Sequence, residues 1–140
     1  MIENLIWIKE KDLLQWACGE SNILVSVSFL SYALVDLTRQ LVFVLSEPKP
    51  LPTVLTIFNA QGEKLFWSAP PEGATFYYLT FNLSKEVIVV CSYPAKKNGW
   101  HDWFYLNGMK RNALSRSGPA YYDKMRFKTF NDSRSQKKRI

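Results

Sequence analysis

Short apolar runs alternate along this chain with clusters of turn-forming residues. The run Leu41–Leu45 is apolar at every position and predicts a strand buried on both faces, which ends at the proline-rich segment Glu47–Pro52. A second strand is predicted at Thr53–Phe58. Asn59-Ala60-Gln61-Gly62 then predicts a hairpin turn into Lys64–Trp67, because glycine readily adopts the positive φ that such turns need. This succession predicts an antiparallel sheet.

The same succession recurs later in the chain. Residues 31–64 realign without a gap on residues 77–110, at an offset of 46, and the densest match pairs Asp36–Val44 with Asn82–Val90. The second copy predicts strands at Val87–Ser92, Trp100–Leu106 and Lys110–Leu114, with a turn at Asn107-Gly108. A leading strand is predicted for each copy, at Ile23–Leu30 continuing toward Leu34 and at Phe76–Phe81. The sequence therefore predicts two four-stranded units, at about residues 22–67 and 76–114.

The ends of the chain resemble incomplete units. Leu5–Ile8 and Leu13–Ala17 match the last hairpin of a unit, and Tyr121–Phe130 matches a first strand. A chain of 140 residues with 47% hydrophobic residues can bury one core. We therefore expect one all-β domain over residues 1–130, followed by a basic and flexible tail over residues 131–140.

The paired strands, the two hairpins and the period of 46 resemble the blades of a β-propeller, whose repeats run roughly 40 to 50 residues. Two blades with partial blades at the termini do not close a ring, since closed propellers have four or more blades. The resemblance therefore implies a sheet array that is open, capped by the terminal strands or closed by oligomerisation. The chain is also similar to lectins built of two blades, which assemble three chains into a ring and bind sugars by stacking on tryptophan.

No segment at the N-terminus reads as a signal peptide, and no apolar run approaches the roughly 20 residues that span a bilayer. These features predict a cytoplasmic protein. Cys91 falls at a strand position that the first copy fills with Leu45, so it is predicted to lie in the core. Cys18 has no counterpart in the repeat, and a disulfide between the two cysteines is not favoured in the cytoplasm.

Charge is divided unevenly. Residues 1–95 carry 6 Lys+Arg and 9 Asp+Glu, a net of −3, whereas residues 96–140 carry 12 and 3, a net of +9. A basic C-terminal region interleaved with aromatic residues can attract a phosphate backbone and stack on bases, so nucleic-acid binding is one hypothesis. The alternation of Met125 and Phe127 with lysine and arginine is equally typical of a protected edge strand.

Catalytic motifs are missing from the sequence. His101 is the only histidine, and the neighbouring Asp102 would point to the opposite face of a strand, so no zinc site or cofactor site is expected. There is no nucleophile elbow and no phosphate-binding loop. We expect a protein without enzymatic activity. The alternative left open is a ribonuclease-like site that uses His101 with a nearby lysine.

The second copy departs from the first most strongly around Lys96–Asp102, where polar and aromatic residues replace a proline-rich and apolar segment. Partner contacts tend to lie where a repeat is broken, because packing demands are shared between copies. The predicted partner-binding residues are Lys96, Lys97, Trp100, His101, Asp102, Trp103, Lys110, Arg111, Tyr121 and Tyr122. The predicted function is binding of another protein, as an inhibitor similar to the immunity proteins that neutralise bacterial toxins. The sugar-binding and nucleic-acid-binding hypotheses are the alternatives, and self-association is compatible with all three.

Overall fold

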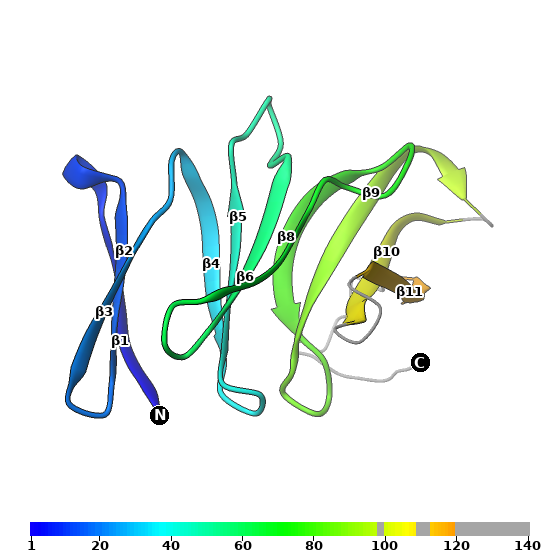
Figure 1. Ribbon diagram of the computed structural model, residues 1–140. Helices are drawn as coiled ribbons and strands as arrows, with labels where there is room; N and C mark the ends of the chain where they lie inside the picture. Colours follow the sequence, from blue (N-terminus) through cyan, green and yellow to red (C-terminus); the bar gives the residue numbers. More distant parts are fainter. Residues whose placement is uncertain (98–99, 109–112, 120–140) are drawn as a thin grey trace.

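Three antiparallel sheets follow one another along the chain (Figure 1). The computed structural model describes residues 1–97, 100–108 and 113–119, with side chains through Pro94. Sheet A consists of β1 (Ile2–Ile8), β2 (Leu13–Cys18) and β3 (Ser21–Ser26), and a 3₁₀ turn at Lys9–Lys11 joins its first two strands. Sheet B consists of β4 (Leu30–Asp36), β5 (Leu41–Ser46), β6 (Val54–Asn59) and β7 (Lys64–Ser68). Sheet C consists of β8 (Thr75–Phe81), β9 (Val87–Lys97), β10 (Trp100–Gly108) and β11 (Ala113–Pro119). The all-β prediction is confirmed.

Two predictions from the sequence, one of a strand and one of a turn, are wrong. The strand expected at Ile23–Leu30 is divided between β3 of sheet A and β4 of sheet B, because the chain turns at Ser28-Phe29 and Phe29 has a positive φ of 55°. Sheet A is consequently three-stranded and not a hairpin fragment. The turn expected at Asn107-Gly108 is also wrong, since β10 continues to Gly108, which pairs with Ala113. The strand predicted at Tyr121–Phe130 and the tail after it lie outside the described residues.

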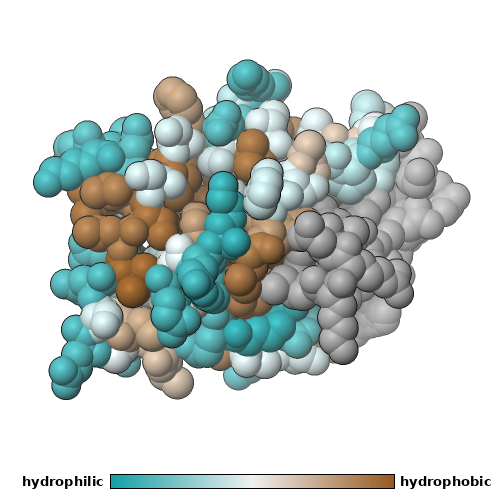
Figure 2. Space-filling model, viewed as in Figure 1, coloured by the Kyte–Doolittle hydropathy of each residue, from teal (hydrophilic) through white to brown (hydrophobic). Residues whose placement is uncertain are grey.

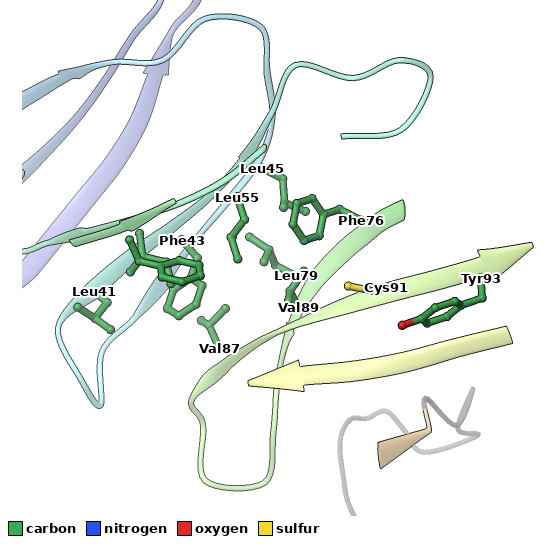
Figure 3. Close-up of a cluster of buried hydrophobic side chains, with 12 residues drawn as sticks. Leu41, Phe43, Leu45, Leu55, Phe76, Leu79, Val87, Val89, Cys91 and Tyr93 are labelled. Carbon is green, nitrogen blue, oxygen red and sulfur yellow. The ribbon is translucent and has the colours of Figure 1, made fainter. Parts of the chain in front are cut away.

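Sheet B is covered on both faces, with sheet A on one side and sheet C on the other. Val42 and Val44 of β5 join a core with residues of sheet A, which include Leu14 and Trp16. The alternate residues of β5 join a second core with residues of sheet C, shown in Figure 3. This second core contains Leu41, Phe43, Leu45, Leu55, Ile57, Phe66, Phe76, Leu79, Val87, Val89, Cys91 and Tyr93. The prediction that Leu41–Leu45 is buried on both faces is therefore confirmed.

The sequence repeat holds in the first strand of each four-stranded sheet. Leu30 and Ala33 of β4 pack toward sheet A, and Phe76 and Leu79, 46 residues later in β8, pack toward sheet B. The ladders are also irregular at the same place, between Leu30 and Tyr32 and between Phe76 and Tyr78. Corresponding positions in the two first strands thus face the preceding sheet.

The gapless register fails in the second strand. Val35 pairs with Val42, and 46 residues later Phe81 pairs with Val87 and not with Ile88. The reason is the number of residues that connect the paired positions, which is six between Val35 and Val42 and five between Phe81 and Val87. A shift of one residue exchanges the two faces of a strand, and Val87 and Val89 accordingly take the places of Val42 and Val44.

Sheet A is joined to sheet B by close side-chain contacts at the β6–β7 turn. Trp16 is fully buried, and its Nε1 donates to the carbonyl of Ala60 at 2.7 Å. Gly62 in the same turn has φ +87°, and a Cβ at this position would lie 2.7 Å from Cγ2 of Ile23. Glycine at position 62 therefore satisfies the conformation of the turn and the packing of β3 against it.

Cys91 is fully buried in the core between sheets B and C, as predicted from the repeat. Burial raises the pKa of its thiol from 9.0 to about 12, because the thiolate would lose its hydration. Cys18 is half-buried and packs against the core between sheets A and B, and both cysteines are free. Sheet B thus separates the two thiols.

Candidate partner-binding surface

Two neighbouring hairpin turns carry large apolar side chains that face solvent. One turn joins β4 to β5 and the other joins β8 to β9, and both lie at the lower end of the sheets in Figure 1. Leu37 in the first turn is 53% exposed, while Leu83 in the second is 63% exposed. Phe81, the last residue of β8, is 40% exposed. We call Leu37, Phe81 and Leu83 the turn surface.

An ion pair between a buried carboxylate and a partly exposed arginine fixes the first turn to the second hairpin. Asp36 is fully buried, and its Oδ1 accepts from the amide of Arg39 at 2.8 Å. Its Oδ2 accepts from Nε of Arg39 at 2.8 Å and from the amide of Val87 at 2.8 Å. The guanidinium of Arg39 in turn donates to the carbonyl of Val87 at 2.9 Å. The carboxylate therefore holds both its own turn and the first residue of β9.

The second turn is held by an asparagine side chain. Oδ1 of Asn82 accepts from the amides of Ser84 and Glu86, at 2.9 Å in both cases. Lys85 completes the turn in a left-handed conformation, with φ 63°, and its amide donates to the carbonyl of Asn82. Oγ1 of Thr38 donates to the carbonyl of Ser84 at 3.5 Å, which links the two turns at their tips. The exposed side chains of the turn surface thus stand on a hydrogen-bonded base.

This arrangement is suited to binding by shape. Exposed apolar side chains on a rigid base lose little conformational entropy when a partner covers them. The described residues contain no group of three or more His, Cys, Asp or Glu side chains that could hold a metal ion. In the same part of the chain, no helix is long and apolar enough to cross a membrane.

The structure places some of the sequence-predicted binding residues on one hairpin. Lys96 and Lys97 lie at the end of β9, and Lys97 is the ladder partner of Trp100 at the start of β10. His101, Asp102 and Trp103 follow in β10, where Asp102 pairs with Ser92 and Trp103 with Cys91. The register shifts between the pairs Trp100–Lys97 and Asp102–Ser92, because β9 has four residues between its two paired positions and β10 has one. The hairpin is therefore irregular where the repeat is broken.

The remaining predicted binding residues, Lys110, Arg111, Tyr121 and Tyr122, lie outside the described residues.

The sequence analysis did not predict the turn surface, although the sequence repeat contains a signal for it. Leu37 and Leu83 occupy the same place in the repeat, and each is apolar within an otherwise polar turn. An apolar residue that recurs inside a turn does not serve the core, and so it indicates a surface.

Another exposed aromatic residue is less favourable for binding. Trp67 on the edge strand β7 is 63% exposed, and Nζ of Lys64 lies 4.8 Å from the centre of its ring. The lysine covers part of the ring that a partner would contact. Trp67 is therefore already engaged within the protein.

No family model, curated protein or solved structure matches this chain.

Proposed function

We propose that this protein is a non-enzymatic module that binds another protein through the turn surface. The observation that carries the proposal is the combination of three exposed apolar side chains, Leu37, Phe81 and Leu83, with the Asp36–Arg39 pair beneath them. Grouped apolar side chains that face solvent often mark protein–protein interaction sites, because covering them with a partner is favourable.

Within this class we favour an inhibitor, similar in role to the immunity proteins that neutralise toxins. A preorganised surface can cover an active site without chemistry of its own. The basic C-terminal region would widen the contact by attracting an acidic partner, through a Coulomb term that needs no defined geometry.

We also propose that the three sheets are blades of a propeller-like array. The repeated orientation of β4 and β8 toward the preceding sheet supports this arrangement. In such an array the turn surface would lie on one rim, where a partner could reach it.

The experiment compares capture of native partners from a lysate of the source cells by the wild-type chain and by a variant that carries Leu37→Ser and Leu83→Ser. Both residues are more than half exposed, so the fold should survive. We expect the double variant to lose at least ten-fold in affinity for whichever protein the wild type captures, since two apolar anchors are removed. The control is Leu65→Ser on β7, where the side chain is 40% exposed.

Unchanged capture by the double variant would overturn the assignment of the turn surface. Loss of capture when Trp100, Asp102 and Trp103 are substituted would instead assign the β9–β10 hairpin. Loss only on removal of residues 131–140, together with nucleic acid in the captured material, would contradict the protein-binding proposal.

A further inference from the structure

The outer face of sheet A carries exposed apolar side chains, and none of the described residues packs over it. Ile6 of β1 and Leu24 of β3 are 49% and 53% exposed, and both lie opposite Gln15 of β2, so they belong to one row across the sheet. Figure 2 shows hydrophobic side chains gathered over this part of the molecule. Within the described residues, β1 has β2 as its only ladder partner, which leaves one edge of β1 without a neighbouring strand.

Sheets B and C show what would fill that edge. In each of them the second strand, β5 or β9, pairs on its free side with a first strand, β4 or β8. The chain enters every first strand directly from the last strand of the preceding sheet. The strand that would complete sheet A is thus a first strand that follows a last strand.

The C-terminal sequence contains a third copy of such a first strand. Residues 124–135, KMRFKTFNDSRS, align with residues 75–86, TFYYLTFNLSKE, which form β8 and its turn. Thr129, Phe130, Asn131 and Ser133 are identical to Thr80, Phe81, Asn82 and Ser84. In sheet B, β4 and its turn have the same pattern, with Tyr32, Val35, Asp36, Thr38 and Arg39 at the places of Phe127, Phe130, Asn131, Ser133 and Arg134. Lys128 departs from it, because it stands where β8 has the buried Leu79.

We propose that residues 124–131 of one chain add as an antiparallel strand to the free edge of β1 in a second copy of this chain. The same association places the outer face of sheet A of that copy on the far face of sheet C. This proposal does not depend on the turn surface, because it uses other residues, but the number of copies derived below rests on the propeller-like arrangement proposed above.

The short connection between β11 and the strand segment indicates that the segment adds to β1 of a second copy and not to β1 of its own chain. The links that lead into β4 and β8 are residues 27–29 and 69–74, and residues 120–123 form a link of similar length after β11. The five steps from Pro119 to Lys124 span at most about 18 Å. Sheet A of the same chain lies beyond sheet B, which places it two sheet spacings, or roughly 20 Å, from sheet C. The chain would also have to cross from the position of a last strand to that of a first strand, which adds to this distance. The segment can reach the place next to sheet C but not its own β1.

The number of sheets sets the number of copies. Each chain contributes sheets A, B and C. Closed radial arrays contain about four to eight sheets, and six is the one multiple of three in that range. A head-to-tail interface that closes after two copies therefore gives a ring of six sheets and a dimer.

Charge favours the same association. Residues 1–26, which build sheet A, carry Lys9 and Lys11 against Glu3, Glu10, Asp12 and Glu20, a net of −2. The strand segment contributes Lys124, Arg126 and Lys128. The acidic end of one copy thus meets the basic end of the other.

The first test is the absolute mass of the full chain by light scattering during gel filtration. We expect twice the chain mass of 16.3 kDa. A chain that ends at Asp123 should have the monomer mass. The matched control ends at Asn131, which removes Arg134, Lys137, Lys138 and Arg139 but keeps the strand segment, and it should remain a dimer.

A double variant tests the proposal in a chain of full length. Ile6→Asp with Leu24→Asp places charge on the outer face of sheet A at exposed positions and should give a monomer that retains the wild-type circular dichroism. Mixing this variant with the chain that ends at Asp123 should give a dimer held by one of the two contacts, because the variant supplies the strand segment and the shortened chain supplies an intact sheet A. A wild-type monomer, or a dimer that persists after removal of residues 124–140, would overturn the proposal.

Discussion

At the scale of single residues, the buried carboxylate of Asp36 is expected to stabilise the fold through the groups that it holds. Asp36→Ala would leave the amide of Val87 without its acceptor and Arg39 without its counter-ion. We expect a loss of about 3 kcal/mol in the free energy of unfolding, measured by urea denaturation. Glu20→Ala, at an exposed turn position, is the control and should change it by less than about 0.5 kcal/mol. A loss below about 1 kcal/mol for Asp36→Ala would show that the ion pair is dispensable.

The two cysteines should differ in reactivity. In the native protein at pH 8, a thiol reagent should modify Cys18 and leave Cys91 intact, because Cys91 is fully buried and its pKa is raised to about 12. Both should react after denaturation. Two reactive thiols in the native state would contradict the burial of Cys91.

The same raised pKa predicts a dependence of stability on pH. Above pH 9 the unfolded chain releases the thiol proton while the folded chain keeps it until about pH 12. Stability should therefore fall as pH rises through this window, by about 1.4 kcal/mol per pH unit from this group. The free energy of unfolding of Cys91→Ala, measured over the same pH range, separates the contribution of Cys91 from that of other groups. An equal decrease with pH in the two proteins would exclude the effect.

At the scale of elements, the hairpin turns at Asn59–Glu63 and Asn82–Glu86 offer a matched comparison. Both are closed by an asparagine Oδ1 that accepts two amides, and their left-handed position is Gly62 in one and Lys85 in the other. We expect Lys85→Gly to stabilise the protein by about 0.5 to 1 kcal/mol, since a side chain is strained at positive φ. Gly62→Ala should destabilise it by about 2 kcal/mol, because the new Cβ also meets Ile23. Urea denaturation measures the free energy of unfolding of both variants. If the two substitutions changed it in the same direction, one of the turns would be wrongly assigned.

The elements also show where sequence patterns suffice. β5 and β9 could be predicted because each contains a short run that is apolar at every position. Such a run is typical of a strand whose two faces are both covered. The division between β3 and β4 could not, because Phe29 is an apolar residue that turns the chain with a positive φ. The register of β9 on β8 also escaped prediction, since a change of one residue in the connection between paired positions leaves the apolar pattern intact while it exchanges the faces.

At the scale of the whole molecule, the two proposed surfaces should act independently. The turn surface lies at the ends of the sheets, whereas the self-association uses the edge of β1 and the outer face of sheet A. Leu37→Ser with Leu83→Ser should therefore leave the mass in solution at the wild-type value. Capture of the partner through the turn surface should likewise persist for the chain that ends at Asp123, with only the contribution of the basic region lost. If the double variant became monomeric, the turns would belong to the contact between copies.

The sequence alone determined that the chain is all-β, that Cys91 lies in the core and that β5 is buried on both faces, because these follow from local alternation and turn chemistry. The tertiary structure decided which strands share a sheet, which face of each strand meets which neighbour, and that Leu37 and Leu83 lie on adjacent turns. These depend on contacts between residues far apart in the chain. The bond from Asp36 to Val87, for example, joins residues 51 positions apart, and no pattern within either segment specifies the other.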